Sequence, residues 1–246
     1  SGQAGGRRLR TPDGQGTRPT SDRVREALFS ALDARGALDE PCRVLDLWAG
    51  TGALARVLAT KGDFVHIWSR REDLAAQING TGKNERYLPS ATLPYSLRAT
   101  HDLKEALKGA TMVVFVCPSH ATREVARLAA PFVPEGVPIV SATKGIENES
   151  LMFIDEILEA ELPAYCKKNL AFLSGPSFAK ELAAELPTGV VIGSHDPHVR
   201  EVVMRRFHAP YMRTYGSDDI VGVECGGALK NVIAIGAGAA DGLGFG

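Results

Sequence analysis

The sequence predicts an α/β protein built on a Rossmann-type, doubly wound parallel sheet, followed by the start of an α-helical domain. Short apolar runs alternate with helical patterns along the 246 residues, and one such run stops at a glycine pair before a helix begins. In a sheet of this kind, ligands bind outside the carboxyl ends of the strands. The chain is long enough to bury a core and to form one large domain or two small ones.

Six strands are expected, each a β-branched or apolar run between turn residues. They cover residues 43–48, 64–68, 112–117, 138–142, 170–173 and 189–193. Helical patterns lie between them, for example at residues 121–130, 151–159 and 179–185. We therefore expect a Rossmann nucleotide-binding domain over residues 41–216.

The last part of the chain has a different pattern. Residues 220–240 form a long, largely apolar helical pattern with few charges, which predicts a helix buried on most sides. We expect residues 217–246 to be the first helix of a truncated substrate-binding helical domain. The longest apolar stretch, around residues 232–240, is short and interrupted by glycines, so no membrane span is expected.

The first forty residues are expected to form a basic arm and a helix. Val24, Leu28 and Leu32 share one face at helical spacing, after a start signal at residues 19–22. This segment is either a surface extension with one docking helix, or a set of arginines that follows a phosphate backbone.

The composition narrows the range of partners. The formal net charge is -1 and 23% of the residues are charged, so no global field recruits RNA or an anionic membrane. The four cysteines are scattered without zinc spacing, which indicates reduced thiols in a cytoplasmic protein. The six histidines form no spaced pair, and no metal site is expected.

The turn after the first strand differs from the dinucleotide fingerprint, G-x-G-x-x-G. Asp46 and Trp48 stand at its first two glycines and Thr51 at the third, ahead of Gly52. A carboxylate there would repel phosphates, and an indole would block their close approach. The pattern suits instead a cationic ligand without phosphate, such as S-adenosylmethionine.

The end of the second strand indicates a different ligand. An acidic residue for ribose hydroxyls is usual at this place, whereas this chain has Arg70 and Arg71. Two guanidinium groups suit the 2'-phosphate of NADP, unless both are simply solvated.

Two family resemblances follow from longer stretches. GGRRLRTPDGQGTRPTSDRVREALFSAL, followed by VLDLWAGTGAL, resembles the amino end of the 16S rRNA guanine-N2 methyltransferase family, over about residues 4–54. That resemblance implies a segment facing RNA and a loop holding S-adenosylmethionine. The family's later N/D-P-P-Y/F motif has no counterpart in this sequence.

From about residue 53 the chain resembles bacterial NAD(P)-dependent glycerol-3-phosphate dehydrogenase. The resemblance rests on LARVLATKGDFVHIWSRR, PSHATREV, VSATKGIE, LSGPSFAKEL and SDDIVGVECGGALKNVIAIGAGAADGLGFG. It implies hydride transfer between dihydroxyacetone phosphate and glycerol 3-phosphate for phospholipid synthesis. The family's Asp, Thr/Ser and Arg-Asn segments of the helical domain are not matched.

The dehydrogenase resemblance also implies site residues. Lys230 matches the catalytic lysine, and Lys144, Gly175, Ser177 and Asn231 match substrate contacts. The cofactor contacts are expected at Gly50, Thr51, Gly52, Arg70, Arg71, Pro118, Lys144 and Ala179.

The residues themselves leave alternatives open. Lys230 lies on an apolar helix, where it either serves chemistry or extends to the surface. Lys144 follows a strand and either binds a ligand or lies in solvent. Ser177 can contact substrate, cap the helix that follows, or do both.

The interpretation favoured by the sequence is an NAD(P)-dependent glycerol-3-phosphate dehydrogenase with weakened cofactor binding and impaired activity. The alternatives are a methyltransferase that uses S-adenosylmethionine, or a non-catalytic fusion or hybrid product. The exposed aliphatic side chains expected on the last helix would make it fold back, form a homodimer or aggregate.

Overall fold

The computed structural model describes residues 43–47 and 51–245. The predicted basic arm and docking helix, as well as Trp48 and Gly50, therefore lie outside the described residues.

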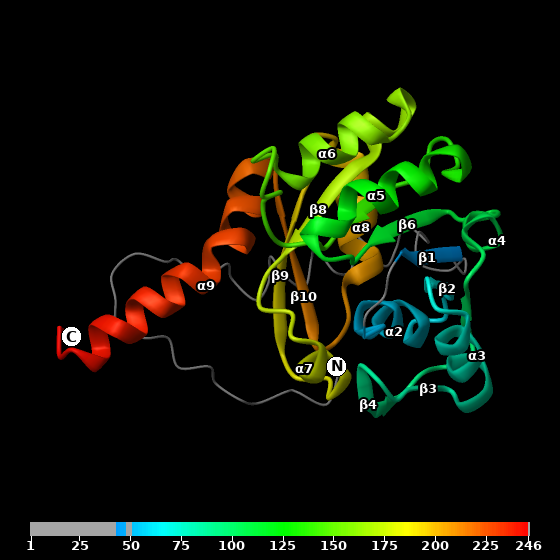
Figure 1. Cartoon of the computed structure of the whole chain (residues 1–246), viewed down its shortest axis with the longest axis horizontal. Helices are drawn as coiled ribbons and strands as arrows, with labels where there is room; N and C mark the ends of the chain where they lie inside the picture. The colour runs from blue at the N-terminus through cyan, green and yellow to red at the C-terminus, as the bar shows by residue number, and fades with distance from the viewer. Residues whose placement is uncertain (1–42, 48–50, 246) are drawn as a thin grey trace, which may run out of the picture. The chain divides into compact units, whose positions relative to one another are not determined.

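The described chain is built on one large, mostly parallel sheet (Figure 1). Its strands lie in the order β10 (Met212–Ser217), β9 (Thr188–Gly193), β8 (Leu170–Ser174), β7 (Ile139–Ser141), β6 (Met112–Phe115), β1 (Arg43–Leu47), β2 (Phe64–Trp68) and β5 (Leu97–Thr100). Only β8 and β9 pair in the antiparallel sense within this sheet. The predicted Rossmann-type α/β fold is confirmed.

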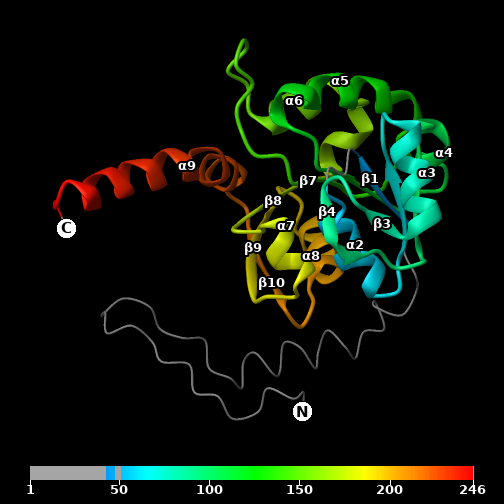
Figure 2. The same ribbon diagram turned by 60° about the horizontal axis from the view of Figure 1, so that its bottom comes forward.

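Helices cover both faces of the sheet (Figure 2). Successive side chains of β1 point to opposite faces of the sheet. Val44 therefore lies in one buried cluster and Leu45 in the other. The Val44 cluster packs under α2 (Ala53–Thr60), α3 (Glu72–Thr81), α7 (Ala179–Ala183) and α8 (Pro197–Phe207). The Leu45 cluster packs under α4 (Leu103–Leu107), α5 (Ser119–Ala129), α6 (Ile154–Glu161) and the first turns of α9 (Ile220–Gly242).

The chain reverses its direction of winding between β1 and β6. From β1 the sheet grows outward through β2 to β5, whereas from β6 it grows the other way through β7 to β8. The carboxyl ends of β1 and β6 thus form the topological switch point, where open α/β sheets bind their ligands.

All six expected strands are present, with bounds shifted by up to two residues. The sequence pattern missed β5, β10 and a hairpin of β3 (Lys83–Asn84) and β4 (Leu88–Thr92). In β10 only Met212 is buried, because this strand lies at the edge of the sheet. An edge strand of this kind carries too few apolar residues to be recognised by its pattern.

Helix α9 covers the predicted residues and continues for two more, but it is buried only over its first turns. Ile220, Val223 and Gly227 are buried against the sheet, but Val232, Ile233 and Ile235 are 65–74% exposed. The helix extends away from the sheet instead of folding back on it (Figures 1 and 2). Its 23 residues continue through the glycines that were expected to interrupt the apolar stretch. By length and composition alone, the helix could cross a membrane. Lys230 and the buried start of the helix weigh against that role.

The turn from β8 to α7 requires glycine at position 175. Gly175 has φ +151°, and a Cβ atom built on it would lie 2.6 Å from the Gly189 carbonyl oxygen and 3.0 Å from Val190 Cα. Both contacts are to backbone of the neighbouring strand β9, which cannot move without breaking the β8–β9 pairing.

We predict that Gly175→Ala lowers the free energy of unfolding by about 1–3 kcal/mol, through the strained backbone and this clash. The control is Gly226→Ala in α9, which has open space around its Cβ position and should raise the stability by about 0.5–1 kcal/mol. Urea titrations followed by circular dichroism measure both, and equal stability of Gly175→Ala and the unchanged chain would contradict the prediction.

Candidate functional site

The predicted site residues gather at the carboxyl edge of the parallel strands. Thr51 and Gly52 follow β1, Arg70 and Arg71 follow β2, Pro118 follows β6, Lys144 follows β7, and Gly175 and Ser177 follow β8. Parallel strands bring their carboxyl ends to one edge, so residues far apart in sequence meet there.

Lys144 is bound to the turn that follows the neighbouring strand. Its Nζ donates hydrogen bonds to the Gly175 carbonyl oxygen at 2.7 Å and to Ser177 Oγ at 3.3 Å. Partial burial and the nearby Lys230 ammonium lower the pKa of Lys144. The lysine is therefore held in the site and is not a freely solvated side chain.

Lys230 reaches the same place from α9. Its Nζ lies 4.9 Å from the centre of the Phe178 ring, an arrangement typical of a cation–π contact. The helix comes this close because Gly227 has no side chain, since a Cβ there would lie 2.7 Å from Ser174 Oγ. Asn231, the next residue, is exposed on α9.

The structure excludes one role of Ser177 and leaves both interpretations of the two arginines open. Helix α7 has Phe178 at its N-cap and no side-chain capping bond, so Ser177 does not cap it. Arg71 forms an ion pair with Asp73, and Arg70 lies 3.9 Å from Glu124 Oε2. Both guanidinium groups are about half exposed at the carboxyl end of β2, where they are solvated and also within reach of a ligand.

A small pocket lies between Lys144 and helix α9. Its lining includes residues from the ends of β7 and β8 and from α9: Ser141, Thr143, Lys144, Ser174, Glu224 and Gly227. Glu224 was not predicted as a site residue, although an acidic residue in an apolar helix is a signal of one. It is 8% exposed, and its Oε1 accepts a hydrogen bond from the Asp155 backbone N–H at 3.2 Å.

Burial changes the charge of this glutamate. Loss of solvent, followed by repulsion from Asp155, raises the pKa of Glu224 to about 8. Its Oε2 is buried and has no hydrogen-bond partner in the described structure. At pH 7 the group beside Lys144 is therefore mostly a neutral acid.

Asp46 in β1 is changed in the same way. It is 1% exposed, and burial raises its pKa to about 8. The carboxylate that we expected to repel phosphates is thus mostly protonated at pH 7, and the repulsion applies only at higher pH. Trp48, whose indole was expected to block the close approach of phosphates, lies outside the described residues.

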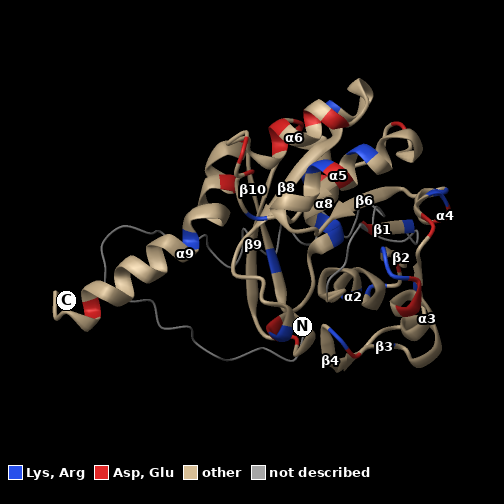
Figure 3. Ribbon diagram, in the orientation of Figure 1, with Lys and Arg blue, Asp and Glu red and all other residues tan. Residues whose placement is uncertain are grey.

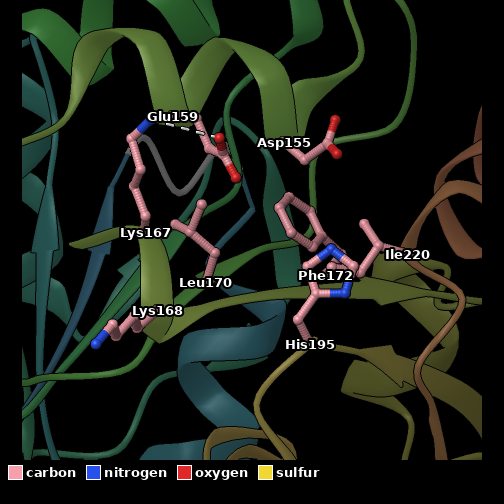
Figure 4. A pocket seen from close by; sticks show the side chains of 8 residues that line it. All are labelled: Asp155, Glu159, Lys167, Lys168, Leu170, Phe172, His195 and Ile220. Atoms are coloured by element: carbon pink, nitrogen blue, oxygen red, sulfur yellow. Dashed lines mark ion pairs between the residues drawn. The ribbon is translucent and has the colours of Figure 1, made fainter. Parts of the chain in front are cut away.

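A second pocket lies at the opposite edge, around the amino end of β8. Figure 4 shows Lys167, Lys168, Asp155, Glu159 and His195 around Phe172, Leu170 and Ile220. Lys167 and Glu159 form an ion pair at 3.5 Å across it. Charges of both signs are distributed over the described elements, and most of α9 has none (Figure 3). In residues 43–47 and 51–245, no group of three or more His, Cys, Asp or Glu side chains could hold a metal ion.

Two protein-family models match this chain. Residues 49–200 match the family model of the NAD-dependent glycerol-3-phosphate dehydrogenase N-terminus, and residues 219–246 match that of the C-terminus. The chain belongs to the NAD-dependent glycerol-3-phosphate dehydrogenase family.

Individual dehydrogenases of this family show how much of the protein is matched. The chain is 48% identical to glycerol-3-phosphate dehydrogenase (NAD(P)+) of Leptospira biflexa and 49% identical to that of Myxococcus xanthus. Each match extends over 194 residues, 79% of this chain and 58% of the relative. The chain thus spans well under two thirds of these relatives.

Solved structures give the same result. The glycerol-3-phosphate dehydrogenase of Coxiella burnetii matches with a TM-score of 0.74 at 37% identity, over 84% of this chain and 63% of that one. The glycerol-3-phosphate dehydrogenase of Saccharomyces cerevisiae matches with a TM-score of 0.74 at 28% identity, over 84% of this chain and 65% of that one.

The raised pKa of Glu224 predicts how stability depends on pH. The folded chain holds this proton more tightly than the unfolded chain, so the contribution is complete below about pH 4.5 and is lost as pH rises toward about 8. Glu224→Gln removes the titration and keeps the oxygen that accepts from Asp155.

We therefore expect Glu224→Gln to raise the melting temperature at pH 8 and to change it little at pH 4.5. Differential scanning calorimetry at the two pH values measures this, with the exposed Glu149→Gln as the control that shows no such difference. An equal shift at both pH values would show that folding does not raise the pKa of Glu224.

Proposed function

We propose that this chain provides the cofactor-binding half and the catalytic lysine of an enzyme that interconverts dihydroxyacetone phosphate and glycerol 3-phosphate with NAD or NADP. The observation that carries the proposal is the convergence of Lys144 and Lys230 beside Gly175 and Ser177. Two ammonium groups at one sheet edge suit a small substrate that carries a phosphate and a polarised carbonyl.

The residues present fit such a cofactor in part. The carboxyl ends of β1 and β6, the left-handed Gly52 at the start of α2, and the arginines after β2 fit a phosphate-bearing dinucleotide. Gly50, Thr51, Gly52, Arg70, Arg71, Pro118, Lys144 and Ala179 are the residues that we assign to it. The side chains of Asp46 and Thr51 fit it less well than the glycines of the fingerprint.

Lys230 is assigned the proton transfer. Its ammonium polarises the ketone oxygen of the substrate and gives that oxygen a proton as the alcohol forms, and it takes the proton back in the reverse direction. A bound nicotinamide supplies or accepts the hydride. Lys144 holds the substrate beside Gly175 and Ser177, and Asn231 contributes a further contact from α9.

Cofactor binding is proposed to be weak. Loss of the close backbone approach at the β1 turn should cost several kcal/mol, on the order of a thousandfold in the dissociation constant. We predict that NADPH binds this chain that much more weakly than it binds the Leptospira biflexa relative. Titration followed by nicotinamide fluorescence measures both proteins, and a micromolar dissociation constant for this chain would contradict the prediction.

The activity test uses the chain joined to the remaining carboxyl-terminal part of the Leptospira biflexa relative, with Asp46→Gly, Trp48→Gly and Thr51→Gly restoring the fingerprint. We expect this protein to consume NADPH with dihydroxyacetone phosphate, and the unaltered chain to show no measurable turnover. Adding Lys230→Met should abolish turnover and leave the dissociation constant of NADPH within about twofold, since the lysine acts on the substrate. Turnover that survives Lys230→Met would remove Lys230 from the mechanism.

The S-adenosylmethionine alternative depends on the same β1 turn. An ionised Asp46 would favour the positive charge of S-adenosylmethionine. Burial keeps the Asp46 carboxyl mostly neutral at pH 7, which favours the dinucleotide. The methyltransferase-like segment before residue 43 lies outside the described residues and remains a separate proposal, as do a cytoplasmic location and a homodimer formed through the exposed aliphatic side chains of α9.

A further inference from the structure

The turn between β8 and α7 contacts both lysines of the site. Its Gly175 carbonyl oxygen and Ser177 Oγ accept hydrogen bonds from Lys144 Nζ. Phe178, the next residue, has its ring face 4.9 Å from Lys230 Nζ. The two ammonium groups come from the end of β7 and from α9, so this one turn determines how close together they lie.

Phe178 is an unusual residue for its position. It is the N-cap of α7 and makes no side-chain capping bond, although Ser, Thr, Asp or Asn would stabilise a helix start better. It is also 55% exposed, so core packing gains little from the ring. Contact with the Lys230 ammonium is what an aromatic side chain adds at this position.

Lys230 lies where α9 leaves the sheet. It is partly buried, whereas residues 231–239 are all exposed. Within residues 43–47 and 51–245, its ammonium forms no hydrogen bond and no ion pair, and the Phe178 ring is the group that contacts it. A lysine side chain has many rotamers, and holding it in one of them requires such a contact.

The neighbouring charge acts against this placement. The Lys230 ammonium lowers the pKa of Lys144, so the two groups are close enough to repel one another. Glu224 lines the pocket beside Lys144, but burial raises its pKa to about 8, and a mostly neutral acid offsets little of the repulsion at pH 7. The negative face of an aromatic ring attracts an ammonium without itself having to ionise.

We propose that Phe178 is a positioning residue, whose ring face holds the Lys230 ammonium beside Lys144 before the substrate binds. This inference rests on the proposed function. The ring itself touches no reacting atom. It raises the fraction of molecules in which Lys230 is in place, and the apparent affinity for the substrate rises with that fraction.

Nuclear magnetic resonance of the chain with isotope-labelled lysine tests the contact at pH 7. The Cε methylene protons beside an ammonium that lies over a ring face are shielded, so the Lys230 signal should lie upfield of the other lysine signals. Lys230→Arg identifies that signal by removing it. Phe178→Leu removes the ring and keeps an apolar side chain, whereas Phe178→Tyr keeps the ring. The matched control is Phe64→Leu, since Phe64 is 54% exposed at the start of β2, away from the carboxyl edge.

Titration of the same proteins with glycerol 3-phosphate tests the role, with the lysine signals reporting binding. We expect the upfield signal to be lost in Phe178→Leu and kept in Phe178→Tyr and Phe64→Leu. The dissociation constant should rise about three- to tenfold in Phe178→Leu, and stay within about twofold in the other two variants. Recovery in Phe178→Tyr shows that the ring face is what matters, because a loss of packing alone would not depend on it.

The outcomes separate this role from the proposed function. If glycerol 3-phosphate shifts the lysine signals but Phe178→Leu binds it as tightly as the unaltered chain, or keeps the upfield signal, the positioning role is overturned and the proposed function stands. If glycerol 3-phosphate shifts neither the Lys144 nor the Lys230 signal in any of the proteins, the proposed function is overturned and this inference with it.

Discussion

The arrangement of the site depends on close backbone packing around Lys144. Its ammonium bonds to the Gly175 carbonyl oxygen, and that carbonyl is available because the β8–α7 turn passes within contact of β9 where no side chain would fit. Gly227 lets α9 approach the end of β8 in the same way. Two glycines thus join β8, β9 and α9 around one lysine, and Lys230 is brought near it as a consequence. A side chain at Gly227 would move the helix that carries Lys230, and a side chain at Gly175 would move the turn that binds Lys144.

Much of this arrangement could be predicted from the sequence, because parallel strands share a carboxyl edge. Once the strands before Lys144 and Gly175 are recognised, their meeting follows from the fold class. The antiparallel pairing of β9 could not be predicted, since an apolar run carries no information on the direction of its neighbour. The edge strand β10 could not be predicted because only its first residue is buried. The contact between Lys230 and Phe178 depends on the packing of α9 against the sheet, which is set by tertiary contacts.

The ionisation of buried carboxyl groups was the property that the sequence predicted least well. Asp46 was expected to be ionised, because an aspartate in water is ionised at pH 7. In the structure burial dominates, as no cation among residues 43–47 and 51–245 offsets the lost hydration, and the group is mostly neutral. Glu224 shows the same effect in α9. In contrast, Glu147 keeps its charge beside Arg123, which holds its pKa near 2. Partners, and not residue type, decide which carboxyls of this fold are ionised.

The two halves of the site are therefore subject to different physical constraints. On the proposed substrate side, Lys144 is held by hydrogen bonds to the Gly175 carbonyl oxygen at 2.7 Å and to Ser177 Oγ at 3.3 Å, and this close packing tolerates little change. On the cofactor side, the first strand differs from the fingerprint, yet the sheet, the switch point and Gly52 at the start of α2 are all present. In the proposed function, a strand end can accept a polar side chain at a graded cost in affinity, because a dinucleotide at this edge would contact several strands and helix α2 at once. A lysine that must meet one oxygen atom has no comparable alternative. The surroundings of Lys144 and Lys230 are accordingly closely packed, whereas the sequence after β1 departs from the glycine pattern without loss of the fold.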